Sequence, residues 1–556
     1  MEAATLCAAF QQTTQLAPDA VALRAFGSPA TITWREYAAR VRRLAAAIAA
    51  RGAQHGDPIA LMMANRPEFH LIDTAAIHLG AVPFSVYNTS PPEQIAHALA
   101  NSGAKLVFAE RQYLSRLTAA GVSTEDICLV EELAAFETTG DPGFDFDAAW
   151  QAVRPDDLLT LIYTSGTTGP AKGVELTHAN LLTEANAVAA VFDLRAGDRI
   201  TSYLPSAHIA DRLSCHYLQM LFRAEVMCIA DPRSLAEALP QARPTIWVAV
   251  PRVWEKMKAR IEQAVADAPA PRRALFALAM KHSRRGTPVL AGLLDRVVLA
   301  RVRRAMGFDQ LRWAMSGAAA IAPQTLRFFL DLGIRVCEVW GMSETCGAGT
   351  VNPPDAIRVG TVGKALPGVD LRLADDGELL IRGPIVTRGY RGDAEQTATA
   401  IQDGWLTTGD VCTIDADGYV SVVDRKKELI INAAGKNMSP TNIENAVKVA
   451  CPLVAAAIVI GDMRPYNVAL LSLDPDAVAA FTQRHGEAGL AAAIKDAIEE
   501  AVRVANSRLS RVEQIKRYTV LDGAWEPGGD ELTPTLKLRR KAIIAKYTEQ
   551  IEAMYQ

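Results

Sequence analysis

The sequence contains few cysteines, no long apolar run and no excess of basic residues. Its eight cysteines are scattered singly through 556 residues, without a Cys-x-x-Cys pair or a histidine at zinc-ligand spacing. Neither a disulfide framework nor a zinc module is therefore expected. No apolar run approaches the roughly 18 residues of a membrane span, and the first residues lack the basic stretch of a signal peptide. We predict a cytoplasmic protein with reduced thiols, whose membrane contact, where it occurs, is peripheral.

The charge and the composition narrow the class of protein further. Lysine and arginine number 58 against 62 acidic residues, which gives a net charge of −4 and no electrostatic footprint for nucleic acid. Half of the residues are apolar and 22% are charged, as in a packed globular protein. A chain of this length exceeds a single ordinary core, so we predict a large multilobed domain and at least one smaller domain.

Short strand-like runs alternate with helical patterns along the first part of the chain. The apolar runs at 158–163 and 245–250 are typical of buried parallel strands. From about residue 370 the pattern changes to short strands and glycine turns, and we place a domain boundary near Asp424. Beyond it the sequence predicts strands at 453–460 and 468–473 and helices at 440–449 and 488–509.

These patterns predict an α/β fold with two parts. The first is a large multilobed N-terminal domain, residues 1–424, with mixed sheets flanked by helices. The second is a small mobile α+β domain, residues 425–556.

The run at 158–163 leads into a glycine-rich and hydroxyl-rich string, Thr164-Ser165-Gly166-Thr167-Thr168-Gly169-Pro170-Ala171-Lys172-Gly173. Glycines let backbone amides approach an anion, hydroxyls donate to phosphate oxygens, and Lys172 supplies a point charge. The string lacks the Gly-Lys-Ser/Thr of a Walker A loop. On its own it is consistent with a triphosphate loop or with a flexible surface loop.

A second string, Glu338-Val339-Trp340-Gly341-Met342-Ser343-Glu344, combines an aromatic residue, small residues and a carboxylate. An aromatic ring can stack on a flat base, and a carboxylate can hold Mg²⁺ that bridges phosphates. A buried tryptophan beside a helix cap is the alternative. Upstream, a strand-like run ends at Gly317, where small residues allow close approach of the backbone. Downstream, Asp410 can only accept hydrogen bonds when ionised and Arg425 can only donate them.

In their order and spacing, these strings resemble the signatures of the adenylate-forming superfamily, which includes acyl-CoA synthetases, luciferases and nonribosomal-peptide adenylation domains. The resemblance implies ATP and Mg²⁺ as cofactors, with Thr164 and Glu344 as metal ligands. It also implies nucleotide contacts from Thr164, Ser165, Gly166, Thr167, Thr168, Gly169, Lys172, Gly317, Glu338, Trp340, Gly341, Ser343, Asp410 and Arg425. Two departures from the family are the order Pro170-Ala171 and Trp340, where tyrosine is usual.

The C-terminal string 532–540 resembles the family's Ser/Thr-Gly-Lys-x-x-Arg element, with Leu536 in place of the glycine. The resemblance implies that Lys537 bridges the acyl carboxylate and the phosphate. It further implies that the small domain swings about a hinge at Lys427, after which Gly435 approaches the pantetheine of coenzyme A.

Two further strings, 203–212 and 250–256, resemble the long-chain fatty acyl branch of this family. In that branch the residue matching His208 lies by the acyl and pantetheine passage, and the residue matching Trp254 gates a fatty-acid tunnel. A satisfied core histidine and a packed tryptophan are the alternatives. The implied enzyme is a long-chain fatty-acid–CoA ligase that forms acyl-AMP and then acyl-CoA.

Three other functions remain open at this point. They are loading of a carrier protein, activation of another apolar acid, and nucleotide binding without catalysis. The last would be expected to have lost Lys537, Glu344 or Lys172, and all three are present. Partners are expected to be the small-molecule substrates alone, with the chain a monomer or a homodimer.

The segment 271–306 is strongly basic, with nine lysines or arginines against one acid, Asp295, on a helical pattern. A solvated helix face explains this pattern simply. The alternative is a surface that docks on anionic lipid or meets the phosphates of coenzyme A.

Overall fold

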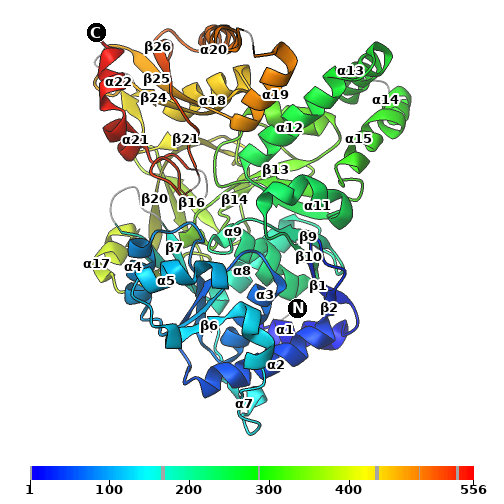
Figure 1. Cartoon of the computed structure of the whole chain (residues 1–556), viewed down its shortest axis with the longest axis vertical. Coiled ribbons are helices and arrows are strands. Elements are labelled where there is room, and N and C mark those ends of the chain that lie inside the picture. Colours follow the sequence, from blue (N-terminus) through cyan, green and yellow to red (C-terminus); the bar gives the residue numbers. More distant parts are fainter. Residues whose placement is uncertain are drawn as a thin grey trace.

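The computed structural model describes residues 3–164, 170–285, 288–432, 437–487, 489–526, 528–533 and 537–556. The N-terminal part forms a large body of sheets and helices, and the C-terminal elements from α18 onward form a smaller body against one end of it (Figure 1). Within the described residues, no helix has the length and apolar character needed to cross a bilayer. The predicted fold class, a large multilobed domain with a small α+β domain, is confirmed.

The first sheet of the large body is parallel, with strand order β4-β3-β5-β6. It is covered by helices that connect its strands, as the alternating pattern predicted. Parallel strands need such crossovers, and both faces of the sheet are then buried. The elements are α2 (Trp34–Ala50), β3 (Pro58–Met62), α3 (Pro67–His78), β4 (Val82–Ser85), α4 (Pro92–Ser102), β5 (Leu106–Ala109), α5 (Leu114–Ala119) and β6 (Ile127–Leu129).

Two more sheets lie in the core of the large body. One has the order β2-β1-β10-β9 and the other the order β11-β12-β13-β14-β15, in which β11, β12 and β13 are parallel. The predicted parallel strand at 245–250 is thus confirmed. The elements are α1 (Leu6–Leu16), β1 (Val21–Ala25), β2 (Thr31–Thr33), α8 (His178–Val191), β9 (Arg199–Ser202), β10 (Glu225–Cys228), α11 (Leu235–Ala242), β11 (Ile246–Ala249), α12 (Pro251–Ala266), β12 (Trp313–Ser316), α16 (Pro323–Asp331), β13 (Val336–Trp340), β14 (Thr350–Val351) and β15 (Lys364–Ala365).

The predicted parallel strand at 158–163 is buried, but its orientation was wrong. This strand, β7 (Leu158–Thr164), pairs antiparallel with β8 (Lys172–Thr177), which in turn pairs with β18 (Gly389–Tyr390). The connection from Thr164 to Lys172 is too short for the crossover that a parallel pair requires. The antiparallel register places Thr164 directly opposite Lys172, so the two ends of the predicted phosphate loop are neighbours.

An antiparallel sheet follows, as the change to short strands and glycine turns predicted. Asp410 on β20 lies opposite Arg425 on β21 in its register. The elements are β16 (Asp370–Leu373), β17 (Glu378–Arg382), α17 (Ala394–Ala400), β19 (Ile401–Gln402), β20 (Trp405–Ile414) and β21 (Val420–Arg425).

The small body packs helices on a sheet with the order β24-β25-β26. Strands β24 (Val454–Ile460) and β25 (Asn467–Leu473) and helices α18 (Pro440–Ala450) and α20 (Leu490–Asn506) confirm the predicted elements. The prediction missed α19 (Pro475–His485), β26 (Ile515–Val520), α21 (Arg540–Lys546) and α22 (Thr548–Ala553). Strand β26 mixes charged and apolar residues and has one sheet neighbour, so its apolar signal is weak.

A set of charged side chains joins α12 of the large body to α18 and α19 of the small body. Arg252 pairs with Asp474, Lys256 Nζ lies 3.7 Å from Asp474 Oδ2, and Lys448 Nζ lies 3.7 Å from Glu255 Oε1. We call these five residues the α12 clasp. In Figure 1, α12 lies next to α19 at the junction of the two bodies. The Asp474 carboxylate is mostly buried, so this pairing is less screened by solvent than an exposed ion pair.

Candidate active site

Lys172 and Glu344 are connected through one tyrosine that the sequence did not single out. The Lys172 ammonium lies 5.1 Å from the centre of the Tyr390 ring and also hydrogen-bonds Gln396. The Tyr390 hydroxyl donates to Glu344 Oε1 at 2.9 Å. Tyr390 therefore holds the predicted metal ligand beside the lysine at the end of the phosphate loop. Five predicted phosphate-loop contacts, Ser165, Gly166, Thr167, Thr168 and Gly169, lie outside the described residues.

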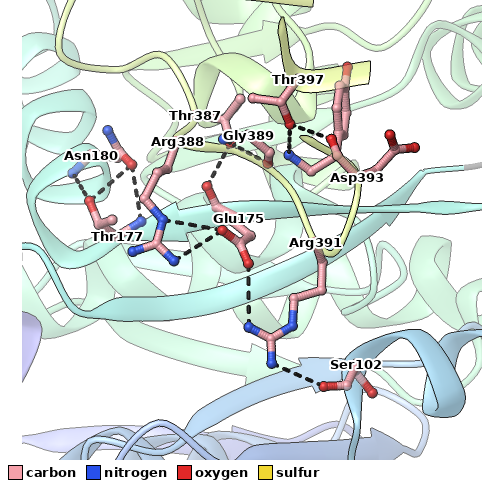
Figure 2. Close-up of polar contacts among 11 residues, drawn as sticks. Ser102, Glu175, Thr177, Asn180, Thr387, Arg388, Gly389, Arg391, Asp393 and Thr397 are labelled. Atoms are coloured by element: carbon pink, nitrogen blue, oxygen red, sulfur yellow. Dashed lines mark hydrogen bonds and ion pairs between the residues drawn. The ribbon is translucent and has the colours of Figure 1, made fainter. Parts of the chain in front are cut away.

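Glu175 on β8 anchors the segment that carries Tyr390 (Figure 2). Its carboxylate accepts from Arg388 at 3.1 Å and lies 3.4 Å from Arg391, and its backbone carbonyl accepts from the Thr387 hydroxyl at 2.6 Å. Since the two arginines flank the two-residue strand β18, their pairing fixes β18 against β8. Glu175 thereby positions Tyr390, which contacts Glu344, although Glu175 and Glu344 are far apart in the sequence.

Asp410, whose side chain is buried, lies at the centre of a polar group made by three elements. Trp340 Nε1 at the end of β13 donates to Asp410 Oδ2 at 2.7 Å, and Arg425 Nε lies 2.7 Å from Oδ1. Burial raises the pKa of the Asp410 carboxyl, and Arg425 and Trp340 oppose that rise. The tryptophan that replaces the family's tyrosine thus contributes an indole N–H donor, which fixes the orientation of its ring.

Glu338 lies on β13, opposite Ser316 on β12. Its side chain is buried, and its Oε2 has no hydrogen-bond partner among the described residues. Burial raises the pKa of this carboxyl to about 8. A buried polar atom without a partner is costly, and a polar ligand group can satisfy it. The predicted role of Glu338 in nucleotide binding is consistent with this unpartnered oxygen.

Gly317 and Gly341 allow close approach, but the atoms that approach them belong to the protein. A Cβ on Gly317 would lie 2.6 Å from Val339 Cγ1, and one on Gly341 would lie 2.4 Å from the carbonyl oxygen of Gly347. Gly317 therefore lets the end of β12 approach β13 closely, and Gly341 lets the end of β13 approach the backbone at Gly347.

The predicted metal ligands are oxygen donors from two separate elements. Thr164 ends β7, and Glu344 lies with Ser343 in the short 3₁₀ helix Ser343–Thr345, where both side chains are buried. Among the described residues, no group of three or more histidine, cysteine, aspartate or glutamate side chains could hold a metal. Mg²⁺ commonly takes one or two protein oxygens and completes its shell with substrate phosphates and water, so Thr164 and Glu344 fit such an ion.

Lys537 is the residue that the small body contributes to this region. Although part of its surface is exposed, desolvation and the nearby Arg425 lower the pKa of its ammonium, while Asp410 and Glu344 act in the opposite direction. Its backbone N–H donates to Thr533 Oγ1 at 3.0 Å, and its carbonyl accepts from the Thr533 N–H at 2.8 Å. Two hydrogen bonds therefore join Thr533 and Lys537, and the charges of Asp410 and Glu344 act on the Lys537 ammonium.

His208 faces the same region from the large body. Its Nδ1 accepts from the Ala210 N–H at 3.1 Å. Burial, together with the charge of Lys537, lowers the pKa of the imidazole to about 3. His208 is therefore neutral at physiological pH and cannot act there as a cationic group.

A buried ion pair positions the turn that carries His208, and sequence reasoning missed it. Arg212 and Asp73 are fully buried and 2.7 Å apart. Arg212 Nε donates to the Ser206 carbonyl at 3.2 Å, and His216 Nε2 lies 2.9 Å from Asp73 Oδ1. Desolvation of Asp73 is outweighed by Arg212 and His216, so the pKa of this carboxyl stays below its usual value. The arginine was visible in the string 203–212, but its partner on α3 was not.

The remaining predicted residues are Lys427, Gly435 and Trp254. Lys427 is exposed in the turn after β21, and Gly435 lies outside the described residues. Trp254 is fully buried in α12, with ring centres 4.9 Å from Trp247 and 4.8 Å from Phe329. Its Nε1 has no hydrogen-bond partner among the described residues. Trp254 is thus part of a packed aromatic cluster in this structure.

Family models and known proteins match nearly the whole chain. A model described as AMP-binding enzyme covers residues 10–391, and a model described as AMP-binding enzyme C-terminal domain covers residues 427–556. The chain belongs to the AMP-binding enzyme family.

Named relatives extend this result. The chain is 52% identical over 433 residues to fadD11 of Mycobacterium tuberculosis (strain ATCC 25618 / H37Rv), provisionally named a fatty-acid–CoA ligase, with 74% of this chain and 76% of the relative covered. It is 34% identical to the long-chain-fatty-acid–CoA ligase FadD15 of the same strain, with 94% and 92% covered. It is 31% identical to the long-chain-fatty-acid–CoA ligase ACSBG1 of Homo sapiens, with 94% and 81% covered.

Solved structures share the fold at lower identity. The anthranilate CoA ligase AuaEII, in complex with anthranoyl-AMP, superposes with a TM-score of 0.77 at 18% identity, covering 98% of this chain and 97% of that one. ATP-bound MatB from Rhodopseudomonas palustris gives a TM-score of 0.75 at 22% identity, with 100% of both chains covered.

Replacing Glu338 with glutamine should change how stability depends on pH. Between its ordinary pKa of 4.5 and the folded value of about 8, the unfolded chain releases the Glu338 proton while the folded chain keeps it. This residue therefore lowers stability by about 1.4 kcal/mol for each unit of rising pH in that window. We expect the thermal midpoint of Glu338→Gln, relative to wild type, to rise between about pH 5 and pH 8 and then level off. The exposed control Glu395→Gln should show no such trend, and a pH-independent difference for Glu338→Gln would contradict the assignment.

Proposed function

We propose that the chain activates a long-chain fatty acid with ATP, forming acyl-AMP and pyrophosphate, and then transfers the acyl group to coenzyme A with release of AMP. The observation that carries this proposal is that Lys537, from the small body, lies close enough to Asp410 and Glu344 for their charges to act on its ammonium. The names of FadD15 and ACSBG1, both similar over 94% of this chain, favour a long-chain acid over other apolar acids.

In the first half-reaction, a carboxylate oxygen attacks the α-phosphorus of ATP and pyrophosphate departs. Two anions must meet, so the chain has to neutralise charge on the phosphoryl oxygens and on the leaving group. The Lys537 ammonium is suited to bridge the acyl carboxylate and the α-phosphate, and Lys172 is suited to meet the departing phosphates. Mg²⁺, held by Thr164 and Glu344, would supply further positive charge at the phosphates.

The nucleoside half of ATP has matching partners in the same region. Asp410 and Arg425 would hold the ribose hydroxyls, the Trp340 ring would stack on adenine, and the unpartnered Glu338 oxygen would face a polar atom of the base. Because Asp410 already accepts from Trp340 and Arg425, the ribose would join a carboxylate whose orientation is set beforehand.

The second half-reaction needs access for a thiol, so the small domain has to move. We place the domain boundary at residues 424/425, with the hinge at Lys427. The C-terminal family model begins at residue 427, and Lys427 lies in an exposed turn, which supports this placement. After the swing, Gly435 would approach the pantetheine, and the neutral His208 would line its passage to the acyl carbonyl.

The expected partners are therefore the fatty acid, ATP and coenzyme A, with the chain cytoplasmic and a monomer or homodimer. A carrier protein in place of coenzyme A is the second candidate acceptor.

Acid-dependent exchange of labelled pyrophosphate into ATP tests the first half-reaction directly. Across a panel of carboxylic acids, we expect exchange to be strongest with long-chain fatty acids and to require Mg²⁺. Addition of coenzyme A should then convert the bound acyl-AMP to acyl-CoA. Absence of exchange with every acid would refute the proposal, and exchange without thioester formation would point to the carrier protein.

Substitution of the adenylation lysine should separate the two half-reactions. In Lys537→Ala, we expect acyl-AMP formation to fall by at least a hundredfold, because the group that neutralises the phosphate is lost. Thioester formation from supplied acyl-AMP should persist, since that step uses the other domain position. Lys541→Ala, a nearby exposed lysine, is the matched control. Equal loss of both half-reactions would contradict the two-position scheme.

Weakening the α12 clasp should disfavour the domain position seen here. Asp474→Asn removes the charge that Arg252 and Lys256 meet, while an amide oxygen can still cap α19 as Asp474 Oδ1 does. We expect the rate of acyl-AMP formation to fall by up to about tenfold, equivalent to about 1.4 kcal/mol, with thioester formation from supplied acyl-AMP maintained. Asp496→Asn, at an exposed carboxylate on α20, should have little effect. An unchanged ratio of the two rates would argue against the clasp.

A further inference from the structure

The basic segment noted in the sequence forms a helical projection from the large body. It comprises α13 (Ala270–Arg285), α14 (Pro288–Leu294), the π-helical turn Asp295–Leu299 and α15 (Ala300–Ala305). In Figure 1, α13 and α14 extend side by side away from the sheets at the upper right. None of the residues in the candidate active site belongs to this projection, so its surface needs a separate explanation.

Large apolar side chains are exposed on this projection to an unusual degree. The described part of the chain contains 14 exposed large hydrophobic residues, and six of them fall between residues 275 and 297. Val289 is 86% exposed and Leu293 is 58% exposed. We call the six residues the hairpin patch: Leu275, Leu278, Val289, Leu290, Leu293 and Val297. Single exposed apolar residues are ordinary, but several of them gathered on adjoining helices are typical of an interaction surface.

Part of the hairpin patch lies on one face of the segment formed by α14, the π-helical turn and α15. Val289, Leu293 and Val297 are spaced by four residues, which places them on one face of a helix. Arg301 follows Val297 by four residues and Arg304 follows Arg301 by three, which keeps them near the same face, and both are exposed. One face is therefore apolar near its outer end and basic near its base.

The positive charge of the projection is largely uncompensated. Among its described side chains, Arg303 pairs with Asp295 at 2.6 Å. Arg272, Lys281, Arg296, Arg301 and Arg304 are exposed and have no carboxylate partner within the described part of the chain. The chain as a whole is net negative, so this concentration of unpaired basic groups is local.

We propose that the hairpin patch docks on the surface of an anionic lipid bilayer. Apolar side chains that project into the acyl region, with basic side chains at the level of the phosphates, satisfy both features together. Binding of free phosphate compounds would leave the apolar residues unexplained. A second copy of the chain would bring two basic surfaces together. The benefit of docking, access to a substrate dissolved in the membrane, rests on the proposed function, whereas the binding itself does not.

Co-sedimentation of the full chain with vesicles tests this proposal. Vesicles of phosphatidylcholine with phosphatidylglycerol should bind the wild type, and vesicles of phosphatidylcholine alone should bind it at least tenfold more weakly. The variants Val289→Asp/Leu293→Asp and Arg301→Glu/Arg304→Glu should each lose at least tenfold in binding to the anionic vesicles. High salt should weaken wild-type binding, because it screens the basic groups.

Matched controls separate the patch from general surface effects. Leu16→Asp changes an exposed leucine elsewhere, and Arg508→Glu/Arg511→Glu makes the same charge change on the small body; both should bind like wild type. Pyrophosphate exchange measured without vesicles should be unchanged in the patch variants, which shows that they are folded. The proposal is overturned if the wild type does not bind anionic vesicles, or if the patch variants bind them as well as the control variants do.

Two other readouts identify the alternatives. A patch variant that dissociates a dimer in sedimentation velocity, with vesicle binding intact, would assign the surface to self-association and overturn lipid docking. A raised KM for coenzyme A in a patch variant, with vesicle binding intact, would assign the surface to phosphate binding. That result would also overturn lipid docking. If the proposed function is wrong, the wild type shows no pyrophosphate exchange. The co-sedimentation result does not depend on that outcome.

Discussion

The buried carboxylate of Asp410 ties together the parts of the molecule on which the site depends. A charge in a low-dielectric interior is costly unless cations and donors compensate it. Trp340 and Arg425 each reach it at 2.7 Å, so the ends of β13 and β21 are held at one point on β20. The same charge acts on the ammonium of Lys537, which belongs to the small body. The position of the small domain and the shape of the site are therefore not independent.

Much of the fold could be predicted because buried strands carry an unbroken apolar signal. The strand at β11 and the strands and helices at β24, β25, α18 and α20 appear where the sequence patterns indicated. The grouping of Lys172, Glu344, Asp410 and Lys537 was predicted from resemblance to a family, since these residues are spread over more than 300 positions. No local pattern relates them.

The features that escaped prediction depend on partners distant in sequence. The orientation of β7 follows from the length of its connection to β8, and an apolar run contains no information about direction. Tyr390 gains its role only because Glu175 holds two arginines beside it. Arg212 can be read as a surface arginine until Asp73, on another helix, is placed against it. The burial of Trp254 likewise depends on rings from β11 and α16.

The eight cysteines, which the proposed chemistry does not require, have a practical consequence. All eight are free and buried, and burial raises the pKa of every one of these thiols. Thiolate is the reactive species, so the folded chain is nearly silent toward alkylating reagents. Because the thiols are distributed from Cys7 to Cys451, the order in which they become labelled under denaturing stress would report which regions open first. The native protein thus contains its own set of local unfolding probes.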